Sequence, residues 1–134
     1  VDQNIAALQK NNGLTILVAE DDPIAQTMLV NILHKLGHYP LCVNNGADAV
    51  KKWQETTVDL ILMDIMMPVM DGWEATRRIR QEEQRKNQLR VPIIAVTALL
   101  MDTNNDDFLK AGLDDTMSKP VHIEDLKNIF NRFA

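Results

Sequence analysis

The feature that most constrains this sequence is Asp64, which directly follows the apolar run 60–63. A carboxylate at the end of a buried strand costs free energy unless something binds it, so packing alone does not explain Asp64. Polar side chains also follow three other segments: Glu20, Asp21 and Asp22 follow the apolar run 16–19, Thr97 follows the apolar run 93–96, and Lys119 follows the short segment 116–118. If these runs are parallel strands, their polar groups meet at one edge of a sheet, where open α/β sheets bind ligands.

Apolar runs alternate with helical patterns along most of the chain. The runs lie near residues 14–19, 39–43, 58–63, 91–96 and 115–118. This alternation predicts an α/β fold with a parallel sheet. The third and fourth runs are almost continuously apolar, as is typical of central strands covered on both faces. The length of 134 residues fits one domain, which we place at residues 14–134, with residues 1–13 as a linker or N-terminal extension.

Helix boundaries are also indicated. Asp22 followed by Pro23 predicts a cap and a first helical residue. Apolar residues then recur at helical spacing until Gly37: Ile24, Met28, Ile32 and Leu36. Further helices are expected at about 47–55, from about 73 to 84 or beyond, and at about 106–111. A last helix is expected at the end of the chain, where four residues form one apolar face: Ile123, Leu126, Phe130 and Phe133. The polar stretch 81–90 is expected to be exposed helix or loop.

Composition narrows the classes of function. A net charge of −5 disfavours nucleic-acid binding, which needs clustered basic residues. No apolar stretch approaches the ~20 residues that span a bilayer, and no signal peptide is recognisable. The single cysteine, Cys42, excludes an internal disulfide framework and a cysteine-based zinc site. We expect Cys42 to be a buried packing residue and the compartment to be the cytoplasm.

The polar groups at the strand ends suit phosphoryl transfer. Oxygen ligands without histidine or cysteine favour a hard ion, Mg²⁺ or its substitute Mn²⁺, with Asp21 and Asp64 as ligands and Glu20 acting through water. Lys119 suits a phosphate, and Thr97 adds a hydroxyl donor. Neither histidine nor cysteine follows a predicted strand as a nucleophile, so Asp64 is the candidate, forming an acyl phosphate.

Four segments together resemble response-regulator receiver domains: ILVAEDD at 16–22, LMDIMMPVMDG at 62–72, AVTA at 95–98 and SKP at 118–120. The resemblance covers about residues 14–133. It implies a flavodoxin-like (βα)5 sandwich whose five-stranded parallel sheet has the order 2-1-3-4-5, the order that a chemotaxis receiver has.

The resemblance also implies residue roles. Asp64 would accept a phosphoryl group from phosphohistidine on a kinase or a histidine phosphotransfer domain. Glu20, Asp21, Asp64 and the Met66 backbone carbonyl would hold Mg²⁺. Lys119, Thr97 and the neighbouring Ala98 would contact the phosphoryl group, and Thr97 would move towards it. The Lys119–Pro120 peptide bond would be cis.

One position departs from the family pattern. Receivers usually carry Tyr or Phe three residues before the lysine, where this chain has Thr116. The polar stretch 102–105 is our candidate for carrying the conformational change instead. The family usually meets partners on its fourth helix, fifth strand and fifth helix. Apolar Met66 and Leu99, two residues beyond Asp64 and Thr97, predict slow self-dephosphorylation because neither can orient water.

The run 67–80 is most similar to receivers of hybrid histidine kinases, so we expect the C-terminal receiver of such a kinase, whose kinase activity would belong to other domains. The isolated chain would catalyse only its own phosphorylation and dephosphorylation. Alternatives are a stand-alone regulator, a pseudo-receiver that binds partners without phosphorylation, and a Mg²⁺-dependent phosphohydrolase. Phosphohydrolases of that kind carry a second aspartate where this chain has Met66.

Overall fold

A computed structural model describes residues 13–98 and 105–133. Its centre is a parallel sheet of five strands in the order β2-β1-β3-β4-β5. The strands are β1 (Thr15–Ala19), β2 (Tyr39–Val43), β3 (Leu60–Asp64), β4 (Ile93–Thr97) and β5 (Asp115–Ser118). The strand order expected from the resemblance is therefore confirmed.

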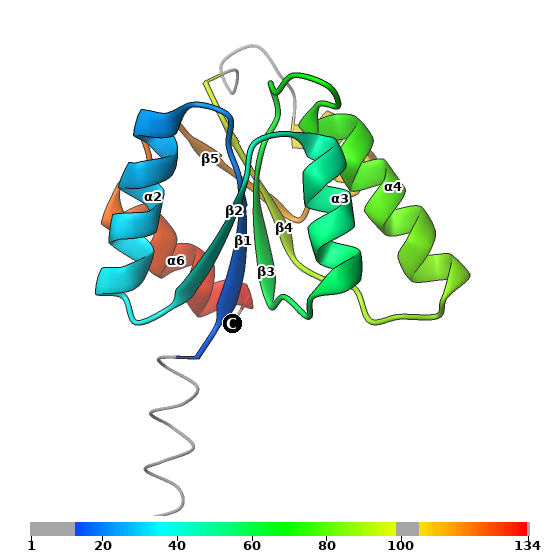
Figure 1. Ribbon diagram of the computed structural model, residues 1–134, viewed down its shortest axis with the longest axis horizontal. Helices are drawn as coiled ribbons and strands as arrows, with labels where there is room; N and C mark the ends of the chain where they lie inside the picture. The colour runs from blue at the N-terminus through cyan, green and yellow to red at the C-terminus, as the bar shows by residue number, and fades with distance from the viewer. Residues whose placement is uncertain (1–12, 99–104, 134) are drawn as a thin grey trace, which may run out of the picture.

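Helices cover both faces of the sheet (Figure 1). They are α2 (Pro23–Lys35), α3 (Gly46–Glu55), α4 (Gly72–Arg85), α5 (Asn105–Lys110) and α6 (Ile123–Phe133). Helices α2 and α6 pack on one face, and α3, α4 and α5 on the other. The fourth and fifth helices of the domain, which the sequence analysis named as the usual partner surface of the family, therefore carry the labels α5 and α6. In the described ranges, none of the helices is long and apolar enough to cross a membrane.

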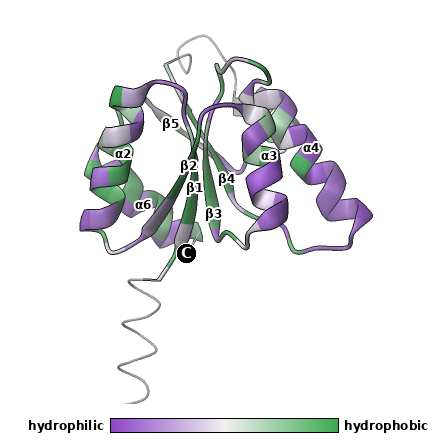
Figure 2. Cartoon of the chain, in the orientation of Figure 1, coloured by the Kyte–Doolittle hydropathy of each residue, from purple (hydrophilic) through white to green (hydrophobic). Residues whose placement is uncertain are grey.

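Successive side chains of each strand point to opposite faces of the sheet, so the hydrophobic core has two halves, one on each face. In β1, Ile16 and Val18 face α2 and α6, whereas Leu17 and Ala19 face the other helices. The same division continues in β3 and β4, whose residues are all buried. Figure 2 shows mostly hydrophobic residues along the central strands, and helices that carry both hydrophilic and hydrophobic residues. The central position of β3 and β4 agrees with their continuous hydrophobicity.

Helix starts follow the sequence signals, but one apolar stripe does not face the core. Asp22 caps α2 by accepting a hydrogen bond from the amide of Ile24. The buried residues of α2 are Leu29 and Leu33, while Ile24 and Met28 are 73% and 49% exposed. Residues spaced by four along this helix therefore divide between the sheet and the surface.

Two further expectations are corrected. Cys42 is exposed, because β2 is an edge strand and its alternating neighbours Leu41 and Val43 are the ones that pack on the core. The polar stretch 81–90 is exposed as expected except at Glu82, which is half-buried, and Glu83, which is buried. Glu83 is only 5% exposed and accepts a hydrogen bond from the amide of Val91.

Some expectations lie outside the described residues. These are the linker assignment for residues 1–12, the position of Leu99, and most of the polar stretch 102–105, of which only Asn105 is placed, as the first residue of α5.

Candidate functional site

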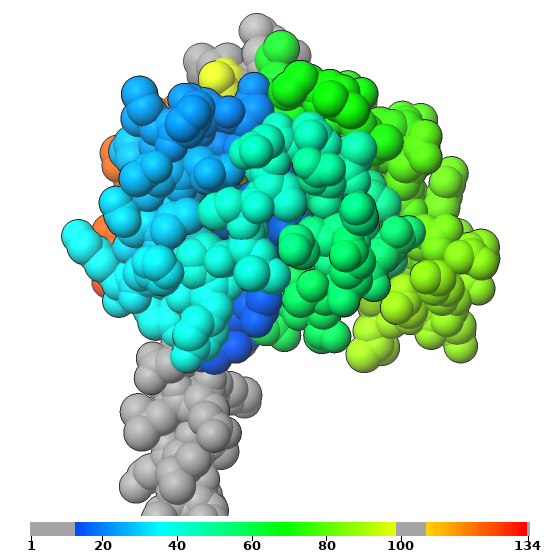
Figure 3. Space-filling view, viewed as in Figure 1, coloured from blue at the N-terminus to red at the C-terminus, as the bar shows by residue number. Residues whose placement is uncertain are grey.

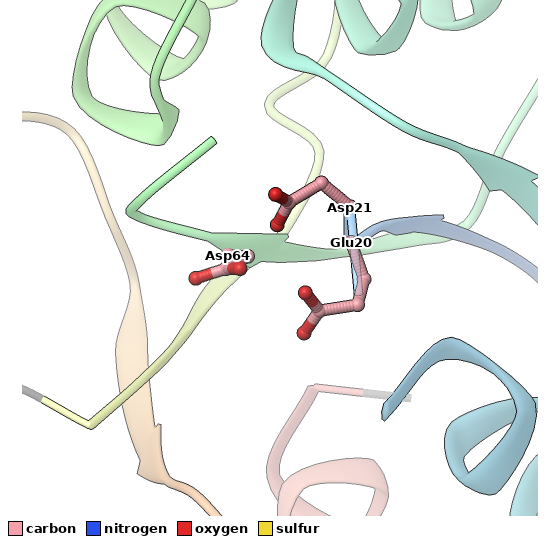
Figure 4. A group of neighbouring side chains, drawn as sticks. All are labelled: Glu20, Asp21 and Asp64. Atoms are coloured by element: carbon pink, nitrogen blue, oxygen red, sulfur yellow. The ribbon is translucent and has the colours of Figure 1, made fainter. Parts of the chain in front are cut away.

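The polar residues at the strand ends meet at one edge of the sheet, the upper edge in Figure 1. Glu20 and Asp21 follow β1, and Asp64 ends the neighbouring strand β3. One carboxylate oxygen from each of these three residues lies within 4.8 Å of the others. Figure 4 shows the three side chains facing a common space. Glu20 and Asp64 are buried, and Asp21 is exposed.

Lys119 follows β5, at the other edge of the sheet from β2, and its side chain completes this cluster. Its Nζ lies 2.7 Å from Oε1 of Glu20 and donates a hydrogen bond to Oδ2 of Asp64 at 3.1 Å. The other oxygen of Asp64, Oδ1, accepts from the amide of Met66 at 3.2 Å. Asp64 is therefore held by contacts to both carboxylate oxygens while its side chain remains 5% exposed.

Burial and charge act against each other at this site. Burial raises the pKa of Glu20, and the neighbouring Asp64 raises it further, although Lys119 opposes both effects. Burial alone would lower the pKa of Lys119, but hydrogen bonding and attraction to Glu20 and Asp64 outweigh it and raise that pKa. The site is thus a small cluster of like charges with one lysine between them.

Close backbone packing fixes the two loops that carry the carboxylates. A Cβ atom on Gly72 would lie 2.3 Å from the carbonyl oxygen of Asp64, so no larger residue fits. The side-chain amide of Gln26 donates to the carbonyl oxygen of Glu20 at 3.0 Å and to Asn44 at 3.2 Å. Sequence reasoning missed Gln26, because only the fold brings α2 against the end of β2.

The remaining predicted residues lie at the same edge. Thr97 is 2% exposed and ends β4, and its carbonyl oxygen accepts from the amide of Lys119 at 3.1 Å. Ala98 follows Thr97 and is exposed. The Lys119–Pro120 peptide bond is cis.

Thr116, the position of the missing aromatic residue, lies away from the carboxylates. It is opposite Ala95 in β4 and half-buried. It borders a space of about 180 Å³ that Phe108 and Leu109 of α5 also line. A small side chain here therefore leaves room between α5 and β5.

Residues 16–131 match the family model described as the response regulator receiver domain. The chain belongs to this family. Among its relatives, the hybrid signal transduction histidine kinase G of Dictyostelium discoideum is 40% identical over the whole chain, and the sensor histidine kinase RcsC of Escherichia coli K12 is 34% identical over 96% of it. The chain spans only 4% and 13% of the length of these two proteins. It is therefore a receiver domain of the kind that hybrid histidine kinases carry.

Solved structures of receivers agree with this assignment. The receiver of a sensor histidine kinase from Pseudomonas aeruginosa, with a magnesium ion coordinated in its active-site cleft, is 39% identical with a TM-score of 0.81, covering 90% of this chain and 97% of that one. The Saccharomyces cerevisiae receiver of Ssk1, solved with the histidine phosphotransfer protein Ypd1, is 31% identical, also with a TM-score of 0.81, covering 90% and 88%. The family and fold of this receiver domain are thus supported by sequence and by structure.

Proposed function

We propose that this receiver domain accepts a phosphoryl group from phosphohistidine onto Asp64, as one step of a two-component phosphorelay. The observation that supports it is the contact of Lys119 with Asp64 and Glu20 inside a cluster of three carboxylates. A buried nucleophile, a cation and further oxygen ligands at one point are the components that phosphoryl transfer needs.

The residues present fit a magnesium ion. Three carboxylates within 4.8 Å and no histidine or cysteine among them form a hard oxygen donor set. We assign Asp21, Asp64 and the backbone carbonyl of Met66 as direct ligands and Glu20 as an outer ligand, and Mn²⁺ could substitute. When bound, the ion would neutralise charge on the transferring phosphoryl oxygens. The P. aeruginosa receiver with coordinated magnesium supports this assignment.

The residues of the chain have distinct roles in the proposed transfer. A carboxylate oxygen of Asp64 forms a bond to phosphorus as the bond from phosphorus to the imidazole nitrogen breaks, and the imidazole leaves neutral, with a proton taken from solvent. Lys119, now on Oδ2 of Asp64, would follow the negative charge onto the phosphoryl group. The hydroxyl of Thr97 and the amide of Ala98 would contact the remaining oxygens.

We propose a phosphohistidine-bearing kinase or histidine phosphotransfer domain as the partner, supported by the complex of the similar Ssk1 receiver with Ypd1. The relatives support a place within a hybrid histidine kinase, whose kinase activity lies in its other domains. A cytoplasmic location is consistent with the single, unpaired cysteine. The isolated chain would catalyse only its own phosphorylation and dephosphorylation.

Beryllofluoride binding with Mg²⁺, followed by NMR, tests the assignment. Saturable shifts are expected around Asp64, Thr97 and Lys119, and Asp64→Asn is expected to abolish them. Asp59→Asn is a matched control, because Asp59 precedes the same strand at its opposite end and is exposed. A response that survives in Asp64→Asn, or no response in the unaltered chain, would exclude Asp64 as the phosphoacceptor and favour the pseudo-receiver.

A further inference from the structure

One side-chain amide on α2 contacts the segment that carries two of the three carboxylates. Nε2 of Gln26 donates to the carbonyl oxygen of Glu20 at 3.0 Å and to that of Val43 at 3.4 Å. It also donates to Oδ1 of Asn44 at 3.2 Å. An amide group carries two N–H donors, so these three acceptors share them. This half-buried side chain therefore joins the end of β1 to the end of β2.

The peptide group that Gln26 holds is the one between Glu20 and Asp21. Asp21 is exposed, so packing around its side chain does little to place it, and its position depends on the backbone. The amide of Glu20 donates to the carbonyl oxygen of Val43 at 3.1 Å, while the carbonyl oxygen of Glu20 accepts from Gln26. The peptide groups on both sides of Glu20 are thus fixed, and the one that leads into Asp21 is fixed through Gln26.

Residues 44–46, here called the bridging segment, extend this contact to the loop of the third carboxylate. They lead from β2 into α3 and begin with Asn44, the partner of the α2 amide. At the other end, the amide of Gly46 donates to the carbonyl oxygen of Met70 at 2.8 Å. Met70 belongs to the loop that follows Asp64. Figure 3 shows the start of α2 (blue), the start of α3 (turquoise) and this loop (green) adjoining one another at the upper edge.

The bridging segment is itself held at the start of α3. Asn45 caps this helix, because its Oδ1 accepts from the amide of Asp48 at 2.8 Å and its Nδ2 donates to the carboxylate of Asp48 at 3.1 Å. Gly46 is buried, and a Cβ atom there would lie 2.4 Å from the carbonyl oxygen of Met70. The spacing of the two carboxylate loops therefore depends on a fixed helix start and on the side-chain amide of Gln26.

We propose that Gln26 is a positioning residue for Mg²⁺, whose amide holds the peptide group between Glu20 and Asp21 at the distance from Asp64 that the ion requires. This rests on the proposed magnesium site and phosphotransfer to Asp64. Mg²⁺ demands near-octahedral geometry with ligands at about 2.1 Å. Three carboxylates within 4.8 Å repel one another when no cation lies between them. Gln26 opposes this repulsion through the backbone, without neutralising any of the carboxylates that the ion needs.

Calorimetric titration of the metal-free protein with Mg²⁺ tests the proposal. Gln26→Met keeps the length of the side chain but lacks the amide, and it is expected to raise the Kd for Mg²⁺ about tenfold, as is typical when an outer-shell contact is lost. Gln81→Met is the matched control, because Gln81 is exposed on α4, and it should leave the Kd unchanged. Asn44→Ala removes one of the three acceptors and should raise the Kd about threefold, but cause no further rise when combined with Gln26→Met.

Labelling of Asp64 by acetyl phosphate separates positioning from folding. Gln26→Met should be labelled more slowly at low Mg²⁺ and should reach the rate of the unaltered chain when Mg²⁺ saturates, whereas a damaged fold would lower the rate at both. An unchanged Kd in Gln26→Met, an equal rise in Gln81→Met, or slow labelling that saturating Mg²⁺ does not restore would overturn the proposal. If Gln26→Met does not fold, an unchanged Kd in Asn44→Ala, whose side chain is exposed, would overturn it. Failure of the unaltered chain to bind Mg²⁺ or to be labelled would instead refute the proposed function.

Discussion

At the scale of single residues, Glu20 in the proposed magnesium site is expected to lower the stability of the metal-free protein. It is 1% exposed, and burial raises its pKa, so its ionised form is disfavoured in the folded chain without metal. Glu20→Gln is therefore expected to stabilise the metal-free protein at neutral pH by about 1 kcal/mol. The same change should weaken Mg²⁺ binding. Urea unfolding with and without Mg²⁺ measures both effects, and a variant that is destabilised without the metal would contradict this account.

His38 is the residue from which we expect an acid-sensitive stability. It is 7% exposed, its ring lies 4.5 Å from that of Phe130 in α6, and its Nδ1 has no hydrogen-bond partner among the residues that the structure describes. Burial lowers the pKa of His38 below its usual range near 6.5. The unfolded chain therefore takes up the proton first, and stability falls as the pH drops below that range.

The pH dependence can be assigned by substitution. His38→Phe is expected to flatten the loss of stability between about pH 7 and pH 5, the range of ordinary histidine titration. His34→Gln is the control, because His34 is exposed. Thermal unfolding at several pH values measures this, and an unchanged pH profile in His38→Phe would show that other groups cause the acid sensitivity.

At the scale of elements, a buried arginine joins α4 to the turn between α5 and β5. Arg80 pairs with Glu83 and Asp114 at 2.8 Å each and donates to the carbonyl oxygens of Val91 and Gly112. Its side chain is 12% exposed, against 55% for Arg90, which also pairs with Asp114. The buried contacts therefore anchor the end of the sheet opposite the acidic site.

Substitution should show this difference. Arg80→Met leaves Glu83 unpaired and is expected to cost about 3 kcal/mol, whereas Arg90→Met should cost less than about 1 kcal/mol. The double variant Arg80→Met with Glu83→Gln is expected to recover part of the loss, because Gln carries no charge and still accepts from Val91. Urea denaturation of the three variants measures this, and equal costs for both arginines would contradict it.

The same elements show where sequence reasoning succeeded and where it could not. The strands were predictable because buried parallel strands need continuous apolar runs, and the cap at Asp22 has a local signature. The strand order came from resemblance, since local patterns do not specify which strands pair. The exposure of Ile24 and Met28 was not predictable, because helical spacing alone cannot distinguish two apolar stripes on α2.

At the scale of the whole molecule, the candidate site was predictable because one topological fact assembles it. Parallel strands bring their carboxyl ends to one edge, so Glu20, Asp21, Asp64 and Lys119 could be grouped before their distances were known. The network around Arg80 was not predictable, because Asp114 lies 34 residues away along the sequence and only the fold brings α4 to the turn between α5 and β5.

The two ends of the sheet should therefore respond differently to phosphorylation. The carboxyl-end edge holds the proposed phosphoacceptor site, and the opposite end is held by the buried ion pairs of Arg80. Between them, α5 spans only six residues and borders the space beside Thr116. Because Thr116 and two residues of α5, Phe108 and Leu109, line this space, we expect α5 to shift against β5 on phosphorylation without an aromatic residue at position 116.

Hydrogen exchange tests this division. Beryllofluoride with Mg²⁺ is expected to change amide exchange in peptides that cover 20–25, 64–71 and α5 with the preceding residues 102–104, but not in peptides that cover 86–93. Asp64→Asn should show none of these changes. Exchange that changes equally at both ends would mean that the Arg80 network does not insulate the far edge. Exchange that is unchanged in α5 would mean that neither α5 nor the stretch 102–105 replaces the missing aromatic residue.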